Sequence, residues 1–131
     1  MAKNNNINKA IILGIGQDGS FLAELLNKKG YEVHGIVREN TSDDRIKWIK
    51  SLIPNIAIYK IDALNKSLLT TIIKTVNPTE IYNFSGVSDV FNPWDNLENT
   101  LLLNAMIPQN ILEVIVSVNK KIKFFQASSC L

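Results

Sequence analysis

The sequence is poor in the residues that build disulfides and metal centres. Its 131 residues include one cysteine, Cys130, and one histidine, His34. A single cysteine excludes an internal disulfide, so we expect a reducing compartment and place the protein in the cytoplasm. One histidine and one cysteine are too few ligands for a zinc-type centre, so no metal site is predicted.

Charge bias and long apolar runs are also scarce. Lys and Arg number 14 against 12 Asp and Glu, a formal net charge of +2. This balance gives no reason to expect a nucleic-acid partner or binding to a membrane surface. We expect no apolar run to approach the length of a membrane span, and the N-terminus lacks the apolar core of a secretory signal.

What the chain does contain is two alternating kinds of apolar segment, and hydrophobic residues make up 46% of it. Short runs rich in Ile, Val or aromatics predict strands at 9–13, 31–37, 56–61, 80–84 and 121–126. The amphipathic stretches between them predict helices at 20–29, 41–52, 63–76 and 96–118, the last kinked or divided at Pro108. This alternation predicts an α/β fold with a doubly wound parallel sheet of about five strands. Residues 1–8 are expected to be a flexible leader, and residues 9–131 one domain.

Helical spacing also predicts which side chains of two helices face the core. The expected core positions are Phe21, Leu22, Leu25 and Leu26 in the first helix, and Leu101, Leu102, Ala105, Leu112 and Ile115 in the last. The strand at 121–126 is expected to leave an apolar edge. Such an edge favours either a longer chain or association between copies, so a homo-oligomer is one expectation.

Three glycines follow the first predicted strand within the stretch LGIGQDGS, residues 13–20. Gly14 would permit a tight turn, Gly16 would let the backbone approach a pyrophosphate, and Gly19 would let the next helix pack on the sheet. The N-terminus of the following helix would supply free N–H groups for an anion, and Gln17 and Asp18 of the loop are candidate cofactor contacts. The pattern therefore predicts a dinucleotide site, and the alternative is a tight turn that binds nothing.

Longer stretches resemble one enzyme family. The segments GQDGSFLAELLNKKGYEVHGIVRE, IYKIDALN, NPTEIYNFSGVSDV and KIKFFQASSCL follow the order and spacing of GDP-mannose 4,6-dehydratases, which are extended short-chain dehydrogenases of the NAD-dependent epimerase/dehydratase group. The resemblance covers about residues 9–131 and is weaker at 39–55 and 91–103. It implies a Rossmann-type fold, NADP as cofactor, and a lyase reaction on a nucleotide sugar that converts GDP-mannose to GDP-4-dehydro-6-deoxymannose.

The resemblance also assigns cofactor contacts. Arg38 matches a contact to the 2′-phosphate of NADP, whereas Glu39 in another register would hold an unphosphorylated ribose and favour NAD; both could also be solvated loop charges. The remaining matches are Asp62 and Ala63 beside the adenine, Asp62 being alternatively a helix cap, and Phe84, Ser85 and Gly86 on the nicotinamide side. The family's T-G-x-x-G-x-x-G loop is one residue shorter here, and Leu13 replaces its threonine.

Catalytic residues are sparse by the same comparison. Ser88 matches a substrate-binding position, although Asp89 replaces the family's histidine beside it. Ser129 matches the hydroxyl that hydrogen-bonds the sugar's C4 oxygen, or is otherwise a capping or loop serine. Leu131 stands where the family has its proton-transferring glutamate.

The family's Tyr-x-x-x-Lys pair is not found in this sequence, because no lysine lies four residues after Tyr31, Tyr59 or Tyr82. We therefore expect a cofactor-binding part of a dehydratase that is inactive as this chain alone. The alternative is a non-catalytic module that binds a nucleotide or a protein.

Overall fold

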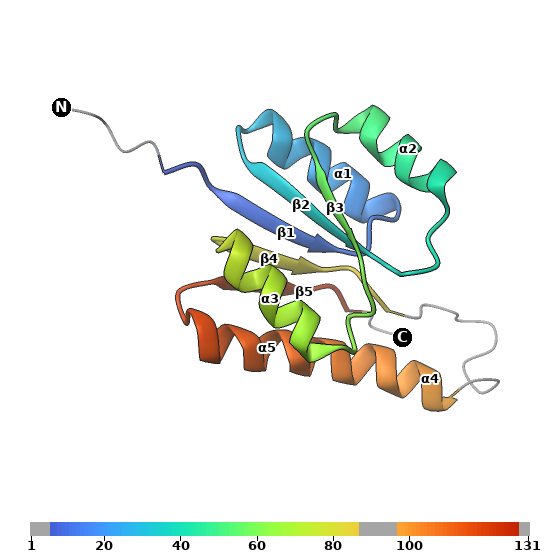
Figure 1. Ribbon diagram of the computed structural model, residues 1–131, viewed down its shortest axis with the longest axis vertical. Helices are drawn as coiled ribbons and strands as arrows, with labels where there is room; N and C mark the ends of the chain where they lie inside the picture. The colour runs from blue at the N-terminus through green and yellow to red at the C-terminus, as the bar shows by residue number, and fades with distance from the viewer. Residues whose placement is uncertain (1–5, 87–96, 129–131) are drawn as a thin grey trace.

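The structure is a computed structural model that describes residues 6–86 and 97–128. Its described strands form one all-parallel sheet in the order β3-β2-β1-β4-β5 (Figure 1). The strands are β1 (Lys9–Leu13), β2 (Glu32–Val37), β3 (Ala57–Lys60), β4 (Glu80–Asn83) and β5 (Lys123–Gln126). The helices are α1 (Gln17–Lys28), α2 (Asp43–Leu52), α3 (Lys66–Val76), α4 (Leu97–Leu101) and α5 (Ile107–Val118), and a π-helical stretch, Leu102–Met106, joins the last two. The predicted fold class is confirmed.

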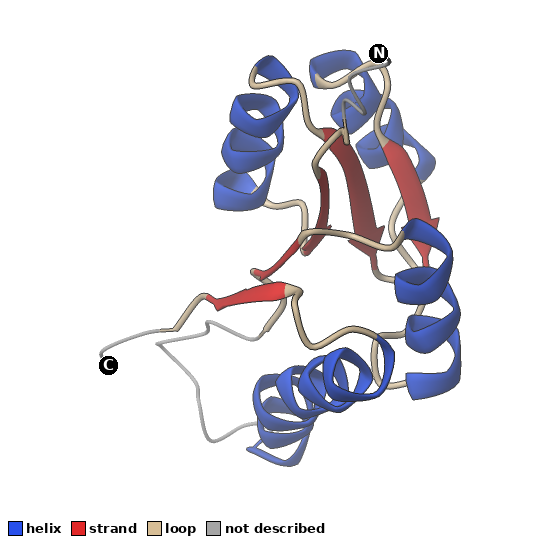
Figure 2. Cartoon of the chain, turned by 90° about the vertical axis from the view of Figure 1, so that its left-hand side faces the viewer, coloured by secondary structure: helices blue, strands red, loops and turns tan. Residues whose placement is uncertain are grey.

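Each face of the sheet carries its own core (Figures 1 and 2). Alternate residues of β1 point to opposite faces, so Ile12 packs with α1 and α2, whereas Ile11 packs with α3 and α5. Both side chains are fully buried. This is why β1 reads as a continuous apolar run rather than an alternating one.

The arrangement places the end of β1 at the point where the chain changes direction across the sheet. β1 pairs with β2 on one side and with β4 on the other. The connection through α1 lies over one face, and the connection through α3 lies over the other (Figure 1). Ligands of doubly wound sheets bind at the carboxyl ends of the strands at such a reversal, and the loop with Gly14 and Gly16 follows β1 there.

Most helix ends match their local sequence signals. The hydroxyl of Ser42 accepts a hydrogen bond from the Arg45 N–H at 3.2 Å and caps α2, a common use of serine. Gly30 follows α1 with φ +86°, which suits a C-terminal glycine. The prediction that Asp62 caps α3 is wrong, because Asn65 accepts from the Leu68 N–H at 3.1 Å and is the cap.

The predicted core face of α1 is partly wrong. Phe21 and Leu25 are 63% and 49% exposed, whereas Gly19, Ala23 and Leu26 are buried. At Gly19 the helix lies too close to the end of β1 and the loop after it for a side chain. A Cβ on Gly19 would lie 2.1 Å from the Gly14 carbonyl oxygen. The buried face is therefore the one with small residues, which hydrophobicity alone does not reveal.

The core face predicted for α4 and α5 is also mostly wrong. Of the positions expected there, Ile115 is buried, whereas Leu101, Leu102, Ala105 and Leu112 are exposed. Pro108 lacks an N–H and crowds the preceding turn, and the π-helical stretch lies directly before it. A wider turn shifts the phase of every later residue. The core side chains of α5 are Ile107, Ile111, Val114 and Ile115.

The expectation about membrane-length segments needs correction. The continuous helical segment Leu97–Val118 has 22 residues and a mean hydropathy of 1.6, so it is long and apolar enough to cross a membrane by length and composition. The core helix of a globular protein meets the same criterion. The α5 part of this segment contributes Ile111, Val114 and Ile115 to the core beside α3.

The expected sheet edge is present among the described strands. β5 pairs with β4 and is the last strand in the sheet order. Phe125 on this strand is 50% exposed and contacts the rings of Tyr82 and Phe84. Association between copies through this edge stays a prediction.

Candidate functional site

A cavity of about 1280 Å³ lies at the carboxyl ends of the central strands. It is lined by all the described residues that the sequence assigns to a cofactor: Gly14, Gly16, Gln17, Asp18, Gly19, Arg38, Asp62, Ala63, Phe84, Ser85 and Gly86. Ser88 and Ser129 lie outside the described residues. The fold thus brings these four separate stretches of sequence to one cavity.

Two glycines of the loop are required by contacts within the protein. Gly14 has φ +82°, and its N–H donates to the Ile36 carbonyl at 3.0 Å. A Cβ on Gly14 would lie 2.8 Å from the backbone nitrogen of Ser85, and one on Gly19 would collide with the Gly14 carbonyl. The predicted turn role of Gly14 and packing role of Gly19 are confirmed. The lack of a side chain at Gly14 also lets the loop after β4 come close to the glycine loop, which the sequence did not indicate.

Gly16 differs from its two neighbours. A Cβ at Gly16 would meet no atom within 4 Å, and its φ is −89°. Gly16 also precedes α1 as its N-cap residue, without a side-chain hydrogen bond to the helix. The first N–H groups of α1 therefore lie beside a space that the described protein atoms leave open, and no contact with those atoms excludes a side chain at Gly16.

One end of the cavity follows strand β2, and we call Arg38, Glu39, Asn40, Thr41 and Arg45 the β2 end. Nη2 of Arg45 donates to the Ile15 carbonyl of the glycine loop at 2.9 Å. The same guanidinium lies 4.2 Å from the centre of the Trp48 ring. The sequence analysis missed Arg45, whose only local signal is its place in the first turn after the Ser42 cap.

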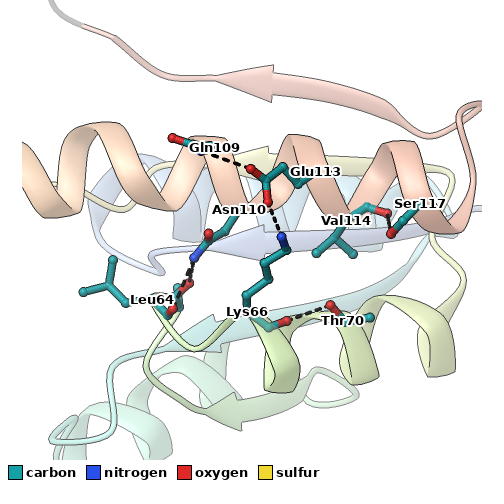
Figure 3. A network of polar contacts seen from close by, with 9 residues as sticks. Leu64, Lys66, Thr70, Gln109, Asn110, Glu113, Val114 and Ser117 are labelled. Carbon is teal, nitrogen blue, oxygen red and sulfur yellow. Dashed lines mark hydrogen bonds and ion pairs between the residues drawn. The ribbon is translucent and has the colours of Figure 1, made fainter.

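The turn after β3 contributes Asp62 and Ala63 to the cavity, and hydrogen bonds from α5 hold its backbone in place. Oδ1 of Asp62 accepts from the Leu64 N–H at 2.9 Å. Nδ2 of the buried Asn110 donates to the carbonyls of Ala63 and Leu64, each at 3.2 Å (Figure 3). Lys66 and Glu113 form an ion pair in the same view, and that pair lowers the pKa of the Glu113 carboxyl.

The opposite end of the cavity follows strand β4, and we call Phe84, Ser85 and Gly86 the β4 end. It is organised by Asn83, which is fully buried. Oδ1 of Asn83 accepts hydrogen bonds from the Ser85 N–H at 3.0 Å and from the Ser85 hydroxyl, and its Nδ2 donates to Oε1 of Gln126 at 2.8 Å. A buried amide with its partners satisfied fixes the loop against the sheet.

Asn104 reaches the same end from the π-helical stretch. A Cβ on Gly86 would lie 2.7 Å from Oδ1 of Asn104. Single π-helical turns inside helices frequently mark functional sites. The sequence analysis missed both Asn83 and Asn104. Pro108 signalled a distorted helix but did not indicate that the distortion aims Asn104 at the cavity.

The described histidine and two tyrosines have structural partners. Nε2 of His34 lies 2.7 Å from Glu32, and this hydrogen bond lowers the pKa of the Glu32 carboxyl. Burial, with a hydrogen bond to Glu80, raises the pKa of Tyr82 to about 12, and Tyr31 shifts in the same direction for the same reasons. Both tyrosines are therefore protonated at neutral pH and unsuited to act as bases.

The family model for GDP-mannose 4,6 dehydratase matches residues 11–130 of this chain. The chain belongs to this family. It is 37% identical to the human GDP-mannose 4,6 dehydratase over 139 residues, covering 98% of this chain and 37% of that protein. It is 40% identical over 129 residues to the GDP-mannose 4,6-dehydratase of Vibrio cholerae serotype O1, covering 92% of this chain and 35% of that protein. The chain therefore spans a little over a third of these curated relatives.

Solved structures agree on the fold. The UDP-glucose 4-epimerase of Bifidobacterium longum, in complex with NAD+ and UDP, superposes with a TM-score of 0.83 at 18% identity over 94% of this chain and 37% of that chain. The epimerase Mth375 of Methanothermobacter thermautotrophicus gives a TM-score of 0.80 at 25% identity, with 95% and 36% covered. The resemblance inferred from the sequence to the dehydratase family is confirmed.

Proposed function

We propose that this chain is the dinucleotide-binding part of a GDP-mannose dehydratase and binds NADP in preference to NAD. The observation that carries the proposal is the open space at Gly16. A glycine is kept there although no contact within the described protein requires it, and the space lies at a helix N-terminus that has no side-chain cap. A diphosphate that approaches the backbone supplies the missing reason.

The residues around the cavity fit such a cofactor. Gly16 and Gln17 would face the diphosphate, and Arg38 would face a phosphate on the adenosine ribose. Asp62 and Ala63 would border the adenine, while the β4 end would face the nicotinamide half. A bound nicotinamide supplies hydride transfer. The chain's own part is to hold the diphosphate and to fix the nicotinamide end through the hydrogen bonds of Asn83.

The substrate part of the proposal rests on the family membership. The relatives are dehydratases of GDP-mannose, and we extend that nucleotide-sugar class to the protein of which this cofactor part is a component. These 131 residues carry no Tyr-x-x-x-Lys, so we expect them to form no dehydrated product from GDP-mannose and NADP by themselves.

The test is a size series at Gly16. Gly16→Ala and Gly16→Val should leave the thermal midpoint within a few degrees of the wild type, because the added atoms enter open space. Calorimetric titration with NADPH should show affinity falling with side-chain size, by roughly tenfold or more for valine, since the diphosphate would be pushed from the helix N-terminus.

Two results would contradict the proposal. One is a wild-type chain that takes up neither NADPH nor NADH at millimolar concentration. The other is a Gly16→Val variant that binds NADPH as tightly as the wild type.

A further inference from the structure

We propose that Arg45 is a second cation for the ribose 2′-phosphate and that it also holds the shortened glycine loop in place. The inference deepens the proposed function and rests on it. Arg45 belongs to α2, in the region where the resemblance to the family is weakest, so its assignment comes from the structure.

The first observation is that the position of the guanidinium is defined by two contacts. Its Nη2 donates to the Ile15 carbonyl at 2.9 Å, and its carbon lies 4.2 Å from the Trp48 ring centre. Of the described residues, Ile15 alone accepts a hydrogen bond from this side chain. Guanidinium groups carry five N–H donors, so most of them are left for a ligand.

The second observation is that Arg45 separates two hollows of the surface. It lines the main cavity together with Arg38, and it lines a smaller groove of about 380 Å³ together with Phe21, Trp48 and Leu52. The groove side of Arg45 is covered by the indole of Trp48. The N–H donors of the Arg45 guanidinium are therefore available to a ligand in the main cavity, at its β2 end.

The third observation concerns charge. Arg38 and Glu39 both line the β2 end, so their formal charges offset each other. Arg45 makes the β2 end net cationic, and no ion pair to Arg38 or Arg45 occurs among the described residues. Of the acids at the start of α2, Asp43 lies 3.9 Å from Lys60, and Asp44 is exposed. A phosphate monoester needs such a surplus of positive charge, whereas a ribose hydroxyl does not.

The bond to Ile15 gives Arg45 its positioning role. Ile15 lies between Gly14 and Gly16, in the loop that is one residue shorter than the family pattern. Its side chain is 5% exposed and would touch a Cβ on Gly35, so the residue is anchored in the core. A hydrogen bond to its carbonyl from α2 fixes the loop backbone beside the open space at Gly16.

The two roles separate in a binding experiment on the full chain. Arg45→Met keeps the apolar stem and removes both charge and donors, and Arg45→Lys keeps the charge without the planar fork. Lys47→Met is the matched control, since it removes one positive charge from an exposed position of the same helix that does not line the cavity. Each variant is titrated with NADPH and with NADH at low and at high salt.

We expect Arg45→Met to weaken NADPH binding about tenfold more than NADH binding. We also expect a smaller loss of affinity, equal for both dinucleotides, because the glycine loop is held less firmly. Arg45→Lys should recover part of the preference for NADPH but not the shared loss. The affinity of the wild type for NADPH should fall more steeply with salt than that of Arg45→Met, and Lys47→Met should behave as the wild type.

An equal loss for NADPH and NADH, or no loss for either, would overturn the role of Arg45 in choosing the cofactor. A loss of preference in Lys47→Met as large as in Arg45→Met would overturn it as well, since the effect would then be one of overall charge. Failure of the wild type to bind either dinucleotide would overturn the proposed function itself. That result is distinct, because it is seen before any variant is made.

Discussion

The two ends of the cavity are built from different chemistry. The β2 end carries two guanidinium groups and the Glu39 carboxylate, and Arg38 and Asn40 on it are exposed. The β4 end carries no charged side chain among its residues and is tied to the sheet by Asn83, which is fully buried. In the proposed site the two ends have different roles: the exposed, charged end selects the ligand, and the buried, hydrogen-bonded end holds a fixed geometry. The attraction between a charged side chain and an anion falls off slowly with distance, so it tolerates motion of the side chain. A hydrogen bond requires a short distance and a defined angle, so a loop that it holds tolerates little motion.

The glycine loop lies between these ends and is connected to both. Gly14 contacts the β4 end through Ser85, and the Ile15 carbonyl contacts the β2 end through Arg45. A Cβ added at Gly16 would contact neither end. The glycine loop thus has one residue in contact with each end, Gly14 and Ile15, and a third, Gly16, beside the open space.

The largest effect is expected where the loop meets the β4 end. Gly14→Ala combines a strained φ of +82° with a Cβ placed 2.8 Å from the Ser85 nitrogen. We expect it to lower the free energy of unfolding by about 3 kcal/mol or more in urea denaturation. Gly30→Ala is the matched control, because Gly30 has φ +86° but no atom within 4 Å of an added Cβ, and it should cost about 1 kcal/mol. Equal losses in the two variants would show that the loop and the β4 end do not constrain each other.

A smaller effect is expected from removing the buried amide of the β4 end. Asn83→Leu leaves the Ser85 N–H without its acceptor and Oε1 of Gln126 without its donor. The free energy of unfolding should fall by about 2 kcal/mol, and NADPH and NADH should lose affinity equally. Ser85→Ala, which keeps the Asn83–Gln126 bond, is the control and should be milder in urea denaturation. A selective loss of NADPH binding in Asn83→Leu would contradict the proposed division between the two ends.

The smallest effect is expected at the exposed β2 end and appears in binding rather than in stability. Arg38→Met should weaken NADPH binding by about tenfold and leave NADH binding and the thermal midpoint nearly unchanged. Glu39→Gln removes the neighbouring carboxylate and should leave NADH binding unchanged if NADP is the preferred cofactor, because Glu39 then holds no ribose hydroxyl. If Glu39→Gln instead lost NADH binding while Arg38→Met kept its affinity for NADPH, the preferred cofactor would be NAD.

Much of the fold could be read from local patterns. The run at Lys9–Leu13 is a strand because four consecutive apolar residues fit a strand buried on both faces. Ser42 caps α2, and Gly30 ends α1, because these residues satisfy backbone groups within a few positions of themselves. The glycine spacing located the cavity for a related reason, since a strand, a turn and a helix in succession bring the loop to the end of the sheet.

The parts that local patterns missed depend on neighbours far along the chain. Phe21 and Leu25 are exposed because α1 packs through the face that carries Ala23 and Leu26, and Leu112 is exposed because α5 packs through Ile111, Val114 and Ile115. Arg45 meets Ile15 across 30 positions and Asn83 meets Gln126 across 43, so no window of sequence contains either contact. Periodicity and turn chemistry act between neighbours in the chain and so specify the elements. Which face of a helix is buried, and which polar side chains reach the cavity, follow from packing between elements that meet only after folding.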